Sequence, residues 1–273
     1  MRRVLGIVAV AVFSALSSGC GQQTEQQQLV ITGSSTVAPL GAELAKAYEA
    51  AHPNVRIDVQ SGGSSRGMND VRKGLADIGM VSRALNDDEG DLTTYTIAYD
   101  GIGMIVNSAN PVRSLSREQI IAIYTNGVNS WAEVGGPEQT IVVVNKAEGR
   151  STLVLFLKFF GLKSADVVAD VVIGDNQQGL KTVAGNPWAI GYVSIGSAEY
   201  EVAQGQPIRL LPLADVEAST AAVREGRFPL SRPLNFVTSP AATGLAEDFI
   251  NFARSPDVHA IVEQQFFIPV DHP

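Results

Sequence analysis

The segment Leu29-Val-Ile-Thr-Gly-Ser-Ser-Thr-Val-Ala-Pro39 contains the change of pattern that decides the fold. Residues 29–32 are apolar or β-branched and predict a short buried strand, whereas the apolar spacing of residues 36–51 predicts a helix that ends at His52-Pro53. Gly33, Ser34 and Ser35 lie between the two elements, and Thr36 begins the helix. A strand that passes through such a loop into a helix is one unit of an α/β protein.

The same alternation of strand and helix patterns continues along the chain. Further strands are predicted at 55–59, 77–81, 102–106, 141–145, 189–194, 208–211 and 234–238. Further helices are predicted at 67–73, 151–160, 241–254 and 256–265. Strands that alternate with helices indicate an α/β fold with mainly parallel sheets.

Two other strand-to-helix junctions look like the first. Residues 60–67 read QSGGSSRG and residues 145–152 read NKAEGRST. A helix N-terminus presents unpaired N–H groups and a partial positive charge, hydroxyls add donors, and glycine lets the backbone approach a ligand closely. Three such junctions that converge would bind a small tetrahedral oxyanion. Ordinary helix capping by Ser and Thr is the alternative explanation.

Composition excludes several classes of protein. The 273 residues are 45% hydrophobic, which is enough for two compact lobes or one large one. The single cysteine excludes a disulfide scaffold and a zinc site with several thiolates. The net charge of −8 argues against a nucleic-acid partner. No nucleotide-binding glycine motif and no metal-binding spacing of the three histidines is present, so we expect no cofactor and no metal.

The N-terminus has the layout of a secretory signal peptide. Two arginines precede an apolar run that is too short to span a membrane, and small residues follow it within residues 1–19. Cys20 comes next, as in a bacterial lipobox, although Ser17 occupies the position three before the cysteine that is usually leucine, and Leu16 lies one place further back. We therefore predict a lipoprotein signal peptide and a palmitate-bearing lipid on Cys20. An ordinary signal peptide with an incidental cysteine is the alternative.

The segment after Cys20 predicts a flexible tether. Residues 20–28 contain the lipidated cysteine and the polar run GQQTEQQQ. Loss of residues 1–19 removes two arginines and no acidic residue, so the net charge changes from −8 to about −10. A lipid anchor with a tether implies work at a membrane surface outside the cytoplasm.

Several of these motifs together resemble one family. The chain is similar to the phosphate-binding lipoproteins of ABC-type phosphate importers, the PstS family, a branch of the type II periplasmic binding proteins. The similarity runs from about residue 29 to residue 265 with order and spacing kept. It rests on five stretches, which are Gly33–Pro39, Gly62–Gly67, the DIGMVSR segment Asp77–Arg83, Asp100–Asn107 and Asn126–Gly136.

The resemblance implies a two-lobed α/β protein with a mainly parallel sheet in each lobe and a ligand cleft between them. The first lobe would be discontinuous, residues 29–107 plus 230–273, and the second would be residues 108–229. The lobes would close around inorganic phosphate and deliver it to the transmembrane subunits of an ABC permease driven by a cytoplasmic ATPase. We expect a monomeric, non-enzymatic protein in the periplasm or on the cell surface.

The resemblance also implies a set of phosphate-binding residues. They are Ser35, Thr36, the N–H of Val37, Ser64, Ser82, Arg83, Lys146, Arg150, Ser151 and Thr152. The third loop departs from the family pattern R-x-[DE]-G-S-G-T, because Lys146 replaces the arginine and Arg150 is added. Ser82 stands where several relatives have an aspartate that rejects unprotonated sulfate. Sulfate and arsenate therefore stay open as alternative ligands.

Two other functional classes compete with this interpretation. Residues 63–67 match G-x-S-x-G, so a hydrolase would use Ser65 as nucleophile with His259. A sensor or adhesion lipoprotein would keep the fold with a degraded cleft. Among the remaining polar and aromatic residues, we expect Trp131 to anchor the core, Asp77 to be a buried carboxylate bonded to backbone, and Asp175 to cap or turn.

Overall fold

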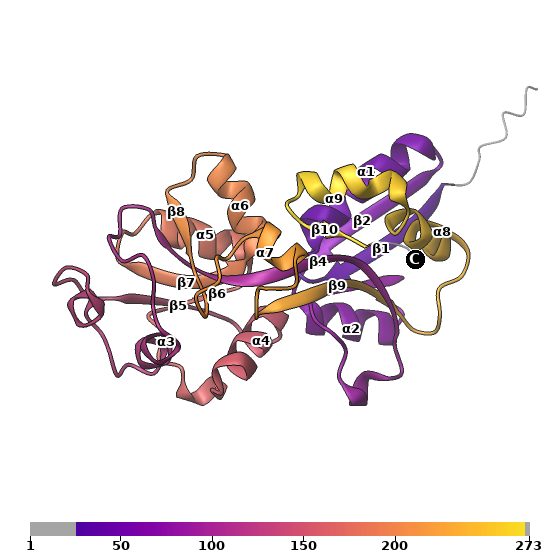
Figure 1. Ribbon diagram of the computed structural model, residues 1–273. Helices are drawn as coiled ribbons and strands as arrows, with labels where there is room; N and C mark the ends of the chain where they lie inside the picture. Colours follow the sequence, from indigo (N-terminus) through magenta and orange to yellow (C-terminus); the bar gives the residue numbers. More distant parts are fainter. Residues whose placement is uncertain (1–25, 271–273) are drawn as a thin grey trace, which may run out of the picture.

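The computed structural model describes residues 26–270 of the chain. The predicted signal peptide and the lipidation site Cys20 lie outside these residues. The described residues form two lobes side by side, and two long strands, β4 (Thr93–Asn107) and β9 (Ser231–Thr238), run between them (Figure 1). The two-lobed α/β architecture predicted from the sequence is confirmed.

The first lobe contains both ends of the described chain. Its elements are β1 (Gln27–Gly33), α1 (Ala38–Ala51), β2 (Val55–Ser61), α2 (Ser64–Arg72), β3 (Ile78–Val81), α8 (Gly244–Ala253), α9 (His259–Gln264) and β10 (Ile268–Pro269). The second lobe contains α3 (Arg117–Tyr124), β5 (Val142–Lys146), α4 (Ser151–Phe160), β6 (Val171–Ile173), α5 (Asn176–Ala184), β7 (Ala189–Ser194), α6 (Ile195–Ala203), β8 (Ile208–Leu211) and α7 (Thr220–Arg224).

One curled mixed sheet runs through both lobes in the order β2-β1-β3-β9-β4-β7-β5-β6. The outer strands are parallel, β2 with β1 and β1 with β3 in the first lobe, and β7 with β5 and β5 with β6 in the second. The two crossing strands β4 and β9 pair antiparallel with each other. Parallel strands place their carboxyl ends at one edge, and ligands of such sheets bind there.

The predicted elements are found with some shifts in their bounds. The strand predicted at 102–106 is the C-terminal third of β4, which begins at Thr93. The helix predicted to begin at Gly67 begins at Ser64, and the one predicted near 241 begins at Gly244. Helices α3, α5, α6 and α7 were not predicted, because helices of only five to nine residues carry little periodic signal.

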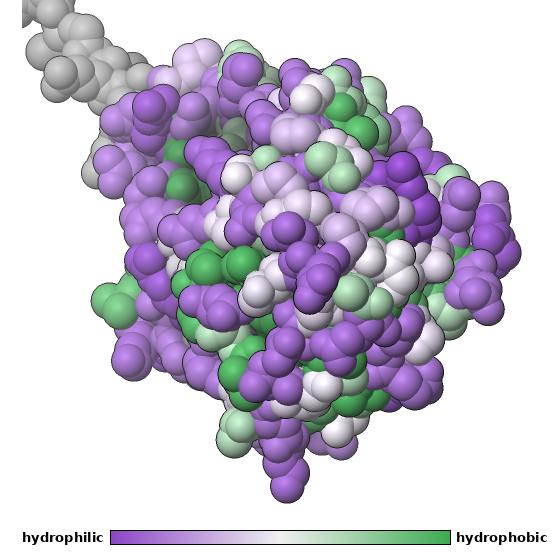
Figure 2. Space-filling view, turned by 90° about the vertical axis from the view of Figure 1, so that its left-hand side faces the viewer, coloured by the Kyte–Doolittle hydropathy of each residue, from purple (hydrophilic) through white to green (hydrophobic). Residues whose placement is uncertain are grey.

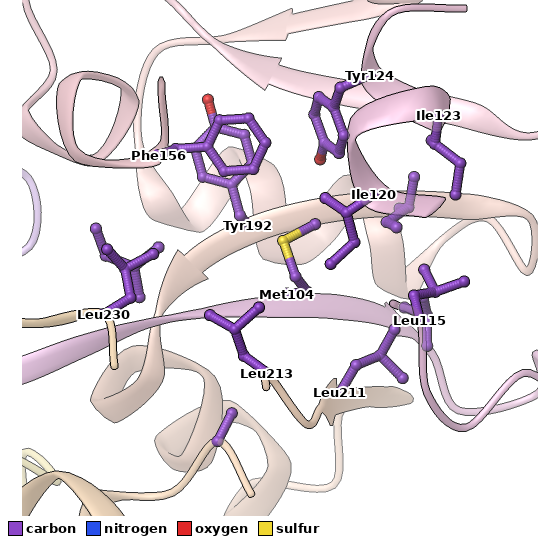
Figure 3. Packing of buried hydrophobic residues seen from close by; sticks show 14 of the residues in the cluster. Met104, Leu115, Ile120, Ile123, Tyr124, Phe156, Tyr192, Leu211, Leu213 and Leu230 are labelled. Carbon is purple, nitrogen blue, oxygen red and sulfur yellow. The ribbon is translucent and has the colours of Figure 1, made fainter. Parts of the chain in front are cut away.

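Each lobe has its own hydrophobic core. The core of the second lobe centres on aromatic residues, and Phe156 stacks on Tyr192 with ring centroids 4.0 Å apart (Figure 3). Trp131 is fully buried in this core and its indole N–H donates to the Trp188 carbonyl at 3.0 Å, so the predicted core role is confirmed. The core of the first lobe surrounds β1 and α1 and includes Phe249.

Strand β4 belongs to both cores. Ile97 and Ala98 pack in the core of the first lobe, whereas Ile102, Met104 and Val106 pack in that of the second. The strand is thus held firmly on either side of a short crossing stretch, residues 99–101.

The outer end of the second lobe is mainly hydrophilic, with smaller apolar patches between the polar residues (Figure 2). Within residues 26–270, no helix has both the length and the hydropathy that a membrane span requires.

Candidate functional site

A small polar cleft lies where loops from the two lobes meet. It is lined by Ser34, Ser35, Thr36, Gly63, Ser64, Ser82, Lys146, Arg150, Ser151 and Thr152. These residues follow the carboxyl ends of β1, β2 and β3 in the first lobe and of β5 in the second. The structure therefore brings together the three junctions that the sequence singles out, at the edge where ligands of parallel sheets bind.

Two residues of the predicted set do not line the cleft. Arg83 is 7% exposed and its guanidinium donates to both carboxylate oxygens of Glu89, at 2.7 and 2.6 Å. The hydrogen bond from Arg83 lowers the pKa of the Glu89 carboxyl. Val37 is the N-cap of α1 and its side chain is fully buried, so a ligand contact at this position rests on its backbone N–H alone.

The first loop fits tightly against β3. Gly33 has a φ of +133°, and a Cβ at this position would lie 2.4 Å from the carbonyl oxygen of Met80, so no other residue fits without a shift of the backbone. The backbone N–H of Ser34 donates to that same carbonyl at 2.9 Å. The Thr36 N–H donates to the hydroxyl of Ser34 at 3.2 Å. These contacts fix the direction in which Thr36 enters the cleft.

The second loop touches the opposite lobe. Gly63 caps α2 with a φ of +96°, and a Cβ there would lie 2.9 Å from both the Arg150 side chain and the carbonyl oxygen of Gly149. The Ser65 N–H donates across the cleft to that carbonyl at 3.3 Å. The hydroxyl of Ser64 accepts from the Ser82 N–H at 3.3 Å and lies in the cleft. The structure is therefore closed, with no room for a side chain at Gly63.

Lys146 supplies a buried cation at the end of β5. The residue is 3% exposed, and its Nζ donates to Oδ1 of Asn176 at 2.9 Å. Burial, together with the positive charges of Arg232 and Arg150, lowers the pKa of Lys146 to about 7. An anion beside it would favour the charged form. Among the described residues, the guanidinium of Arg150 makes no hydrogen bond or ion pair, and it lines the same cleft.

The sequence analysis missed Arg232, which lies behind the cleft and binds three of the hydroxyls that line it. It pairs with Asp100 at 2.8 Å, and both side chains are 1% exposed. The same guanidinium donates to the hydroxyls of Thr36 at 3.2 Å, Thr152 at 2.9 Å and Ser82 at 3.4 Å. Asp100 and Arg232 are direct partners in the β4–β9 register, so the ion pair lies on the two crossing strands.

Asn176 is the second missed residue. It is the first residue of α5, is 3% exposed, and donates from Nδ2 to the Thr36 hydroxyl at 3.0 Å. β6 and α5 form a fourth strand-to-helix junction, but its residues Gly174, Asp175 and Asn176 carry no hydroxyl, so it does not match the three that the sequence singles out. Asp175 caps α5 by accepting from the Gln178 N–H at 2.8 Å, as predicted. Asp77 accepts from the Val30 N–H at 2.7 Å, so the predicted bond to backbone is confirmed, but the residue is exposed and the prediction that it is buried was wrong.

The arrangement is suited to bind a small anion. Asp100 compensates Arg232, while Lys146 and Arg150 leave positive charge at the cleft, and the N-termini of α2, α4 and α5 add to it. Within residues 26–270, no cluster of His, Cys, Asp and Glu could hold a metal ion. In the same part of the chain no hydrogen bond joins the Ser65 hydroxyl to a histidine, which a serine nucleophile would need for activation.

Comparison with known proteins agrees with this chemistry. The family model of the PBP superfamily domain matches residues 19–257. The phosphate-binding protein PstS of Bacillus subtilis is 27% identical over 284 residues, which cover 97% of this chain and 93% of that protein.

Solved structures give the same relationship. A Clostridium perfringens protein described as a phosphate ABC transporter substrate-binding protein, solved with bound phosphate, is 30% identical. It superimposes with a TM-score of 0.83 over 90% of this chain and 100% of its own. An ABC-type phosphate transport receptor from Vibrio cholerae is 31% identical, with a TM-score of 0.71 over 89% of this chain and 100% of its own. The chain therefore belongs to the PBP superfamily, where its relatives are phosphate-binding proteins of ABC phosphate transporters.

Proposed function

We propose that this protein is an extracytoplasmic receptor that binds inorganic phosphate between its lobes and delivers it to an ABC permease. The observation that carries the proposal is the convergence of hydroxyls from four loops with Lys146 and Arg150 in one buried cleft. Charged donors and hydroxyls in a dry site bind an oxyanion strongly, because each bond is charge-assisted and poorly screened. The proposed ligands are Ser35, Thr36, the Val37 N–H, Ser64, Ser82, Lys146, Arg150, Ser151 and Thr152.

The proposal includes a membrane anchor and a route of delivery. Cys20 would carry the lipid after removal of residues 1–19, and residues 21–28 would link it to the fold. The lobes would be residues 29–107 plus 230–273 and residues 108–229. The transmembrane subunits of an importer with a cytoplasmic ATPase would receive the phosphate. Mass spectrometry of the membrane-bound protein tests the anchor, since an acyl group on Cys20 is expected and a Cys20→Ser variant should be released from the membrane.

Isothermal titration tests the binding function. The chain without residues 1–20, freed of ligand, should bind phosphate at micromolar or lower concentration and give no heat with sulfate. Thr152→Ala and Ser64→Ala should weaken binding without unfolding the protein. Thr182→Ala is a matched control, because that hydroxyl bonds only within its own helix α5. Absence of phosphate binding in the wild type, or unchanged affinity in both cleft variants, would contradict the proposal.

Ser82 favours a second class of ligand. A carboxylate at this place would repel an unprotonated oxyanion, whereas the hydroxyl of Ser82 carries no charge. Arsenate and sulfate are therefore alternative ligands of the same cleft. Titration with each anion in turn separates them, because phosphate and arsenate keep a proton near neutral pH and sulfate does not.

A further inference from the structure

Asn176 joins the two lobes directly behind two residues that line the anion cleft, Lys146 and Thr36. Its side chain comes from α5 of the second lobe and contacts Lys146 of the same lobe and Thr36 of the first lobe. All three residues are at most 3% exposed. Lys146 and Asn176 are brought together by two neighbouring parallel strands, because Lys146 ends β5, Asn176 follows β6, and β5 pairs with β6 in the sheet.

The chemistry of Lys146 fixes the orientation of the Asn176 amide. A lysine ammonium has three donors and no acceptor, so the amide atom 2.9 Å from Nζ must be the oxygen. The amide nitrogen then faces the hydroxyl of Thr36 at 3.0 Å and donates to it. The charge of Lys146 thus orders a chain of hydrogen bonds that ends at Thr36.

Arg232 completes this chain from the other side. A hydroxyl oxygen has two acceptor lone pairs, and at Thr36 one receives Asn176 Nδ2 and the other receives Arg232 Nη2 at 3.2 Å. The Thr36 hydroxyl can therefore only donate its proton to a third group, and the residue lines the cleft. The hydroxyl of Thr152 differs, because among residues 26–270 it accepts from Arg232 alone, which leaves its second lone pair without a protein donor.

We propose that Asn176 is a positioning residue that makes the Thr36 hydroxyl an obligate donor to the bound oxyanion. This inference rests on the proposed function, since it assigns a role within the same cleft. At this position the cleft selects an oxyanion oxygen that carries no proton. The contact of Asn176 with Thr36 also crosses between the lobes, so it orders the donor in the closed form.

Three variants test this role by phosphate titration of the chain without residues 1–20. Asn176→Asp keeps the shape, but its carboxylate would accept a hydrogen bond from the Thr36 hydroxyl and repel the anion, so the dissociation constant should rise about 100-fold or more. Asn176→Ala should raise it about 10-fold. In a Thr36→Val background, Asn176→Ala should change it by less than about threefold, because the two residues act through one bond.

The matched control is Gln177→Ala, one residue along α5, whose side chain bonds to Glu201 on the surface. Its affinity should equal that of the wild type. A phosphate affinity of Asn176→Asp within about threefold of wild type would overturn the proposal. The proposal would also be overturned if the dissociation constant of the double variant rose by the full product of the increases in Asn176→Ala and Thr36→Val.

A second readout needs no ligand and separates this inference from the proposed function. The ammonium of Lys146 can be titrated by NMR in the free protein, with Arg232, Arg150 and Asp175 as the charged groups that face it. Asn176→Asp should raise the pKa of Lys146 and Asn176→Ala should lower it. An unchanged Lys146 titration in both variants would refute the ordering role of Asn176. If the two variants show the expected shifts but the wild type does not bind phosphate, only the phosphate function is refuted.

Discussion

The buried ion pair between Asp100 and Arg232 holds an arginine against the hydroxyls that line the cleft, and Asp100→Asn tests what the pair contributes. The substitution keeps the shape of the side chain and removes its charge. Arg232 then stays 1% exposed without a carboxylate partner. Loss of one partner of a buried ion pair costs about 3–5 kcal/mol of folding free energy.

The expected magnitude can be expressed as a melting temperature. For a chain of this size, 1 kcal/mol corresponds to about 2–4 °C. The amide introduced by Asp100→Asn would still accept one hydrogen bond, and Thr36 and Thr152 still accept from Arg232, so the loss falls at the lower end of the range. Without ligand, Asp100→Asn should therefore melt about 10 °C below the wild type in a calorimetric scan.

Phosphate should reverse much of this loss. An anion in the cleft lies beside the hydroxyls that Arg232 contacts, so it supplies the negative charge that the variant lacks. The wild type should gain about 4 kcal/mol at a phosphate concentration about 1,000 times its dissociation constant. The variant should gain about 1–2 kcal/mol more, since its uncompensated cation is neutralised only when phosphate binds.

A matched control separates this effect from a general loss of negative charge. Glu263→Gln removes a carboxylate from the exposed pair with Arg224, where about half of each side chain is accessible, and it should shift stability by less than about 0.5 kcal/mol. Equal phosphate-induced shifts in Asp100→Asn and wild type would refute the reasoning. Equal shifts would mean that the charge of the bound anion does not stabilise the Arg232 guanidinium.

Lys146 and Gly63 give three further predictions. The phosphate affinity of the wild type should fall relative to Lys146→Arg as pH rises from 7 to 9, because Lys146, with a pKa of about 7, loses its proton; titration at several pH values measures the ratio. Without ligand, the free energy of unfolding of the wild type should instead rise relative to that of Lys146→Met over the same pH range, by up to about 1.4 kcal/mol per pH unit. The reason is that Lys146 keeps its proton in the unfolded chain but loses it in the folded one, and chemical denaturation at several pH values measures the difference. Gly63→Ala should weaken phosphate binding at least about tenfold and enlarge the radius of gyration by X-ray scattering, because its Cβ collides with Gly149.

The residues that the sequence identified are those whose local pattern carries their chemistry. Ser35, Thr36, Ser64 and Thr152 stand at strand-to-helix junctions, where hydroxyls and helix N-termini occur together, and the structure places all four in the cleft. The α/β fold was predictable for the same reason, because its strands and longer helices are periodic over short stretches.

The residues that the sequence missed act through contacts distant in the chain. Arg232 reaches Thr36 across 196 positions and Asn176 reaches it across 140, so no window of neighbouring residues contains the pair. Arg83 shows the opposite case. It is next to Ser82 in the chain and was predicted to bind the anion, but its guanidinium forms a buried ion pair with Glu89, six residues later. A local pattern gives the type of group at a position, and tertiary packing decides which partner it takes.

The crossing stretch of β4, residues 99–101, is a hinge between the lobes and lies next to the anion cleft. The two halves of β4 are clamped in separate cores, and Asp100 lies between them, paired to the arginine that touches hydroxyls of both lobes. Rotation of one lobe relative to the other would bend this stretch. It would also break the hydrogen bonds from Arg232 to the hydroxyls of Thr36 and Thr152. The outer faces of the lobes lie far from this stretch. A partner that bound those faces and rotated the lobes would therefore weaken the binding of the anion without contacting it.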